Sequence, residues 1–283
     1  MNDGVAEVRP RALSDRSRHW VAFAVLVLAV LAVVPPLSSW ARHTEVLESL
    51  QFSILAVVVP SLLVVGAPWR LLGLATPAPD AGGPRAPRAF DRLADGRRRH
   101  PQLLRSLGFL AVDLAVVVAW QTPGAVDGLV RHGWLVVPEA LSLVAAGIGL
   151  WLECVESPPV APRLPRPQRA LVAALAMWAM WAMAYMVGLS RTSWYQGFTH
   201  RAGHGLSAAA DQQFSSAVLW AVAAAAFLPV IFYNVVTWLR SDEDPDDELY
   251  RLIKDERRRG WASPPPLGGL GGGPDTERRP DTG

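Results

Sequence analysis

Polar residues that can hold protons or metal ions recur inside the apolar stretches of this chain. Glu48 and Gln51 stand three residues apart at the start of one stretch, Glu139 lies near the start of another, and Asp113 lies in the middle of a third. An ionised acid at the centre of a membrane helix costs about 2.5–3.5 kcal/mol on insertion scales. We therefore expect Asp113 and Glu139 to face other helices, either on a proton or metal pathway or in a hydrogen bond that locks two helices together.

Further candidate residues lie at the ends of these stretches. Gln121 follows one stretch, and Asp211 and Gln212 open the last. Four methionines recur every third residue, and their thioethers would suit Cu(I): Met177, Met180, Met183 and Met186. Three-residue steps drift by about 60° each around a helix of 3.6 residues per turn, so the four cannot share one face. Packing is the favoured role, and Met186 alone is kept as a candidate ligand.

The elements that carry these residues are predicted to be membrane helices. The chain has 283 residues, and 51% of them are hydrophobic. A helix needs about 20 apolar residues to cross roughly 30 Å of hydrocarbon. Six stretches qualify, at about residues 20–40, 48–69, 104–122, 132–152, 169–190 and 212–239. The sequence therefore predicts an all-α, polytopic membrane protein with a six-helix transmembrane domain over residues 19–240, whose first helix is retained rather than cleaved as a signal peptide.

Basic residues predict the orientation of these helices. All but four of the 27 Lys and Arg residues fall in the N-terminal segment, the second and fourth connections and the tail. The positive-inside bias places these segments, and both termini, in the cytoplasm of a bacterial plasma membrane. The candidate residues other than Asp113 then share the outer third of the membrane: Glu48, Gln51, Gln121, Glu139, Met186, Asp211 and Gln212. Four of the six histidines lie on the same side: His43, His132, His200 and His204.

The flanking segments and the lone cysteine add little chemistry. Residues 1–18 form a basic N-terminus, residues 241–260 predict an amphipathic cytoplasmic helix, and residues 261–283 are Pro- and Gly-rich and predicted to be disordered. Cys154 is the only cysteine and is interpreted as apolar filler. The chain has no nucleophile elbow, phosphate-binding loop or HExxH motif, so we expect neither an enzyme nor a nucleotide-binding protein. The excess of Arg on one side of the membrane is explained by the orientation of the helices, so we expect no nucleic-acid partner.

Three segments, in this order and spacing, resemble one known family. They are VVPSLLVVGAP, WQTPGAVDGLVRHGWLVVPEALSL and DQQFSSAVLW, the last of which is the closest match. Together they resemble the CtaG family of bacterial membrane proteins, assembly factors for cytochrome c oxidase thought to help supply copper. The likeness extends from about Trp20 to the start of the tail. It implies oxidase subunits and membrane lipid as partners, a place in the respiratory chain, and copper as a possible cargo.

The chain departs from this family at the imidazoles. Where the family begins its second span with His-x-x-Gln-His, this chain has Glu48, Gln51 and Phe52. The Trp-His pair is Trp120-Gln121, and the Glu-His pair is Glu139-Ala140. An amide binds copper poorly and a methyl group cannot bind it. Any bound copper would therefore need other ligands in place of the missing histidines. The candidates are Glu48, Glu139, Met186 and the histidines of the loops.

Three hypotheses follow from these residues. The first is a non-enzymatic assembly factor for a haem–copper oxidase that handles copper at its outer face. The second keeps the fold without metal and makes the protein a scaffold that docks on the oxidase. The third is a small transporter or proton-linked channel that uses Asp113 and Glu139.

Overall fold

A computed structural model describes residues 15–67, 69, 103–157, 160, 162, 164–199 and 207–240. Within them, six helical segments are long and apolar enough to cross a membrane, which confirms the predicted all-α, six-span architecture: Phe23–Trp40, Glu45–Gly66, Leu103–Trp120, Gly133–Cys154, Arg166–Gly188 and Ala208–Leu239. Most of the predicted basic N-terminus lies outside the described residues. So do the predicted helix at 241–260 and the predicted disordered tail at 261–283.

The first two spans are broken where prolines interrupt helical hydrogen bonding. Helix α1 (Asp15–Val33) ends before Pro35 and Pro36, and the short α2 (Leu37–Trp40) follows. The second span consists of α3 (Glu45–Ser53), a π-helical turn η1 (Ile54–Val58) and α4 (Val59–Gly66). Proline has no backbone N–H, so Pro60 cannot make the regular helical hydrogen bond to the carbonyl four residues earlier. The wider turn of η1 ends two residues before Pro60 and lets the span continue.

The remaining spans are α7 (Leu103–Trp120), α9 (Val136–Cys154), α10 (Arg166–Gly188) and α12 (Ala208–Leu239). The connection between the third and fourth spans contains helix α8 (Pro123–Arg131) and a 3₁₀ turn, η2 (Gly133–Leu135). Pro123 occupies a first helical position, where a missing N–H is tolerated. A four-residue helix, α11 (Gln196–Thr199), lies between α10 and α12, and α12 runs through Pro229 without ending.

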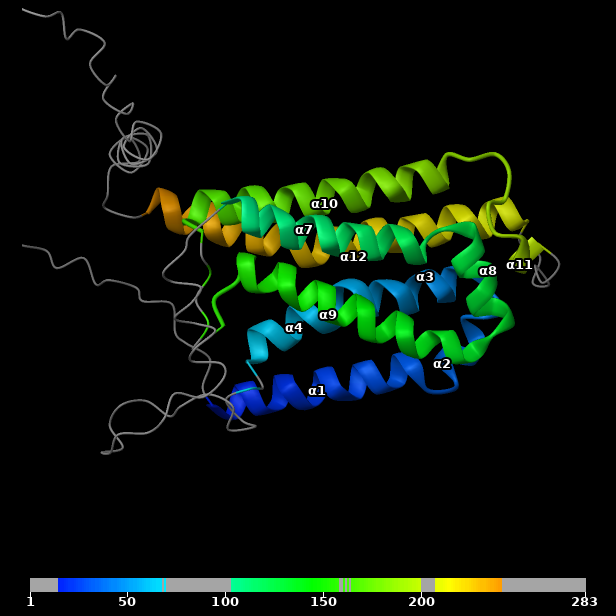
Figure 1. The fold of residues 1–283 in the computed structure, drawn as a ribbon, viewed down its shortest axis with the longest axis horizontal. Coiled ribbons are helices and arrows are strands. Elements are labelled where there is room, and N and C mark those ends of the chain that lie inside the picture. The colour runs from blue at the N-terminus through cyan, green and yellow to red at the C-terminus, as the bar shows by residue number, and fades with distance from the viewer. Residues whose placement is uncertain are drawn as a thin grey trace, which may run out of the picture. The chain divides into compact units, whose positions relative to one another are not determined.

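The span with the most polar residues is the most enclosed. In this second span 61% of the residues are buried, against 11% in the first. In Figure 1, α3 and α4 lie between α1 and the layer formed by α7, α10 and α12, with α9 alongside. This position removes the polar side chains of α3 from lipid, where they would lack hydrogen-bond partners.

Close packing holds α9 against the second span and against α12. Gly147 lies directly over Pro60, so that a Cβ at this position would stand 2.6 Å from the Pro60 Cγ. The Trp151 ring stacks on Phe227 of α12, with 4.7 Å between centroids. Three of the four methionines, Met177, Met180 and Met183, are buried in the core, in agreement with the packing role expected for them.

One end of the bundle is covered by short helices. We name it the capped end, since α2, α8 and α11 all lie there (Figure 1). Three tryptophans on these segments and their flanks are exposed: Trp40, Trp134 and Trp194. Tryptophan is enriched where a membrane helix meets the interface. The charge bias predicts that the capped end is the outer one.

The contact between Gly147 and Pro60 can be tested by adding one methyl group. Gly147→Ala forces the α4–α9 pair apart and should lower the free energy of unfolding by about 1–3 kcal/mol, the usual range for overpacking. The matched control is Gly108→Ala on α7, where nothing lies within 4 Å of the added carbon. Thermal unfolding in detergent should show a lower melting temperature for the first variant only; equal melting temperatures would contradict this packing.

Orientation can be tested by cysteine labelling. Cys154 is buried and is the only cysteine in the sequence, so a Cys154→Ala background contains no thiol. In it, Thr192→Cys, exposed at the capped end, should react with a membrane-impermeant maleimide in intact cells. Glu156→Cys, exposed after α9 at the opposite end, should react only after the membrane is opened. The reverse pattern would overturn the predicted orientation.

Candidate functional site

The start of α3 is held by a side chain from another span. The Asp211 carboxylate accepts hydrogen bonds from the backbone N–H groups of Glu45, at 2.9 Å, and Val46, at 3.4 Å. The first N–H groups of a helix have no partner within it, so a carboxylate there acts as a cap and complements the helix dipole. One turn further on, the Ser49 hydroxyl donates to the Ser215 carbonyl at 2.8 Å. These bonds fix α3 against α12 and thereby set the direction of its polar side chains.

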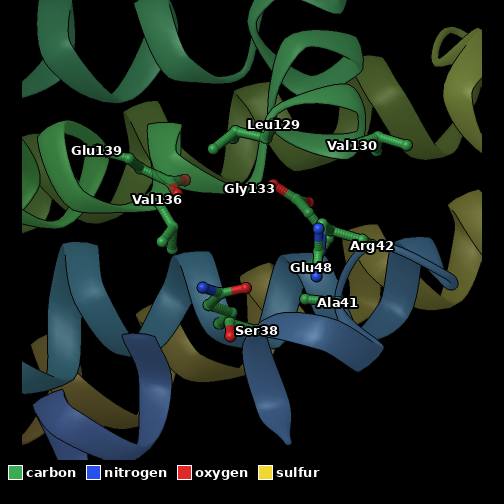
Figure 2. A pocket seen from close by; sticks show the side chains of 10 residues that line it. Ser38, Ala41, Arg42, Glu48, Leu129, Val130, Gly133, Val136 and Glu139 are labelled. Carbon is green, nitrogen blue, oxygen red and sulfur yellow. The ribbon is translucent and has the colours of Figure 1, made fainter. Parts of the chain in front are cut away.

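Glu48, Gln51 and Glu139 face a common cavity between α3 and α9, which we call the α3–α9 cavity. Its volume is about 20 Å³, enough for one water-sized occupant. Residues from α2, α3, α8, η2 and α9 line it: Ser38, Ala41, Arg42, Glu48, Gln51, Leu129, Val130, Gly133, Val136 and Glu139. In Figure 2 the Glu139 carboxyl enters from α9, while the Glu48 carboxyl lies beside the Arg42 side chain.

The polar groups of this cavity are deeply buried and incompletely paired. Glu48, Gln51 and Glu139 are 6%, 5% and 3% exposed. Among the described residues, Glu48 Oε1 and Gln51 Nε2 have no hydrogen-bond partner. Buried polar atoms are nearly always paired in native proteins, and an unpaired one suggests a missing water or ion. The α3–α9 cavity is therefore suited to a small polar or charged occupant.

A lid of α8, α11 and the segment before α11 lies beside this cavity at the capped end. The Tyr195 hydroxyl donates to the Gln121 side chain at 3.1 Å and to its carbonyl at 3.2 Å. Burial, together with the nearby carboxylates of Glu48 and Glu45, raises the pKa of the Tyr195 phenol above its usual value. Tyr195 therefore stays a hydrogen-bond donor at neutral pH.

Gln212 fastens the same lid to α10. Its Oε1 accepts from the Trp194 backbone N–H at 2.8 Å, and its Nε2 donates to the Val187 carbonyl at 2.7 Å. Asp127 of α8 accepts from the Gly197 N–H at 2.8 Å. These bonds join the connection that contains α8 to the connection that contains α11, and join the latter to α12 and the end of α10. The lid is thus held by side-chain–backbone bonds as well as by a small apolar cluster of Val126, Val130, Val187, Tyr195 and Phe198.

The predicted site residues divide into three groups. Glu48, Gln51 and Glu139 line the cavity. Gln121, Asp211 and Gln212 lie at the same end but hold helices and lid together, through the bonds described above. Met186 belongs to neither group, since its side chain is 60% exposed on α10 and does not line the cavity, and its role as a ligand stays a prediction.

Asp113 and Glu139 are both buried, as expected, but they lie in different places. Asp113 is 1% exposed and does not line the α3–α9 cavity. A further buried acid at the far end of α9, Glu153, accepts a hydrogen bond from the Ser106 hydroxyl at 2.8 Å. This bond links α7 to α9.

Sequence reasoning missed three residues of the site: Glu45, Arg42 and Tyr195. Glu45 stands three residues before Glu48 and so shares its helical face, a signal that was available. Arg42 was noted only as an outer basic residue, but its side chain lies over Gly133 at the cavity. Tyr195 lies in a connection without periodicity, where no local pattern indicates a buried side chain.

The donors at the capped end do not suit Cu(I). Cu(I) prefers thiolate and thioether ligands, while the cavity offers carboxylate and amide oxygens. His43 and His132 are exposed and do not line it, and His200 and His204 lie outside the described residues. In the part of the chain that the structure describes, no group of three His, Cys, Asp or Glu side chains is arranged to hold a metal ion.

Comparison with known proteins gives one match. The model of the family described as "Cytochrome c oxidase caa3 assembly factor (Caa3_CtaG)" matches residues 3–241, a range that contains all six spans. No curated protein and no solved structure matches the chain.

The cap that Asp211 provides can be tested by removing its carboxylate. Asp211→Ala leaves the Glu45 and Val46 N–H groups unpaired in a buried place, and should lower the free energy of unfolding by about 1–2 kcal/mol. Gln213→Ala, an exposed amide two residues further along α12, is the matched control. Melting temperatures in detergent check this: an unchanged value for Asp211→Ala would show that the cap contributes nothing.

Proposed function

The chain belongs to the cytochrome c oxidase caa3 assembly factor family, and we propose that it assists the assembly of a haem–copper oxidase without catalysing a reaction. The observation that carries this proposal is the match over residues 3–241, which includes every span and connection that builds the capped end. The protein is multi-pass, and in this proposal it works in the bacterial plasma membrane. Its lid would meet the immature oxidase at the outer membrane surface.

The position of polar and aromatic side chains supports the capped end as the working surface. Gln121, Asp211 and Gln212 gather there, and Trp134 is 68% exposed on η2. Tryptophan is among the residues that dominate binding energy in protein interfaces. A capped end that presents exposed aromatic rings is a suitable docking surface for a membrane-protein partner.

The chemistry of the cavity favours the second hypothesis over copper handling. A metal-free scaffold needs only the fold and an exposed surface, whereas Cu(I) handling needs soft donors at one place. Met186 is exposed on α10 and does not line the cavity that holds the oxygen donors. Transport through Asp113 and Glu139 stays a prediction, because no described contact joins the two side chains.

Deleting the gene in its host should lower the amount of assembled oxidase, measured as haem a absorbance and oxidase activity of membranes. Wild-type protein should restore it. Trp134→Ala should restore less and should weaken co-purification with oxidase subunits, by about 2 kcal/mol if the ring is a binding hot spot. An unchanged oxidase level in the deletion strain would contradict the proposed function.

The matched control for that experiment is Trp20→Ala. Trp20 is 67% exposed, close to the 68% of Trp134, but it lies near the start of α1, at the other end of the bundle. A general effect of losing a lipid-exposed indole would appear in both variants. Loss of co-purification in Trp134→Ala alone would assign the docking surface to the capped end.

A further inference from the structure

We infer that the α3–α9 cavity is a binding site for a hard divalent cation, of the class of Mg²⁺, Mn²⁺ and Ca²⁺. The inference names the ligand class of the capped end and in that respect rests on the proposed function. Glu48 and Glu139 supply the charge, and Gln51 supplies a neutral donor. Nothing in the argument needs copper.

The first step concerns the donors. Glu48 Oε1 is directed into the cavity without a hydrogen-bond partner, and the Glu48 side chain is more than nine-tenths buried. Gln51 Nε2 is likewise unpartnered there. A half-turn of the amide exchanges Nε2 for Oε1 at little cost, since the two ends have the same shape. The cavity then presents oxygens from three side chains, the donor type that Mg²⁺, Mn²⁺ and Ca²⁺ prefer.

The second step concerns charge. The ion pairs seen among the described residues, such as Arg131–Asp127 and Arg169–Glu156, do not include Glu48 or Glu139. Arg42 lines the mouth of the cavity, and Glu45 and Asp211 add acidic charge at the start of α3. Two carboxylates and one guanidinium, that of Arg42, thus line the cavity, and a buried carboxylate without a counter-charge costs several kcal/mol. A divalent cation between Glu48 and Glu139 would offset the negative charge that Arg42 does not balance.

The third step concerns size and access. A cavity of about 20 Å³ accommodates one ion and excludes an organic ligand. Ser38, Arg42 and Gly133 line the cavity and are only partly buried, which provides a route from the capped end. Ions of this class keep some water ligands where protein donors are few, and here those waters would lie at the mouth of the cavity. Two carboxylates and an amide at such a mouth therefore suffice for a site of modest affinity.

The test is a Mn²⁺ titration of the full-length protein in detergent after treatment with a chelator, with free Mn²⁺ followed by electron paramagnetic resonance. We expect about one Mn²⁺ per chain, displaced by Mg²⁺ or Ca²⁺ and not by buffered Cu(I). Replacing both acids, Glu48→Gln with Glu139→Gln, should weaken binding more than about tenfold, because carboxylate charge sets affinity in oxygen sites. The matched control, Asp113→Asn, changes a buried acid outside the cavity and should bind as wild type does.

Two results would overturn the inference. The first is that the wild-type protein takes up no Mn²⁺ or Ca²⁺, which would leave water or protons as the occupant of the cavity. The second is that the wild type and the double variant bind Mn²⁺ equally. Should the double variant fail to fold, the wild-type stoichiometry and the single Glu139→Gln variant decide. Wild-type protein that restores oxidase in the deletion strain but binds no ion would overturn this inference alone. An unchanged oxidase level on deletion contradicts the proposed function and leaves the titration result standing.

Discussion

The need to keep the polar side chains of α3 out of lipid constrains the whole bundle. Hydrocarbon offers no hydrogen-bond partners, so a span that carries Glu45, Glu48, Ser49 and Gln51 is stable only when other helices surround it. The surrounding helices supply specific partners as well as cover, since Asp211 caps the first turn and the Ser215 carbonyl accepts from Ser49. The position of α12 therefore depends on the polar content of α3 as much as on apolar packing.

The π-helical turn connects this polar half to the apolar half of the same span. A π turn adds a residue to the turn and rotates the faces on its two sides relative to each other. Here it separates Glu48 and Gln51, which face the cavity, from Pro60, which packs under Gly147. One helix can therefore present a polar face at the capped end and a close-packed face at the other. The lack of a Cβ at Gly147 is what allows this close approach of α9.

The sequence predicts the spans better than the roles of single residues, for physical reasons. The length and hydropathy of a segment indicate directly whether it lies in lipid, so they predict the six spans. Because an acid in lipid is costly, they also predict that Asp113 and Glu139 are buried. The direction of Met186 depends on how α10 rotates against its neighbours, which no pattern in its own apolar sequence reveals. Tyr195 is buried by a lid of short segments, α8 and α11, each too short to stand alone as a helix.

Asp211 and Gln212 show why a family likeness identifies important positions without identifying their chemistry. Both were expected near a metal, and both lie at the capped end, yet their polar atoms are engaged by backbone groups of α3, α10 and the lid. Residues that form such hydrogen bonds stabilise the bundle whatever ligand its cavity contains. Among the described residues that line the cavity, by contrast, Glu48 Oε1 and Gln51 Nε2 form no hydrogen bond to the backbone or to another side chain. A change of ligand class can therefore occur at these positions while the bundle, its cap and its lid are preserved.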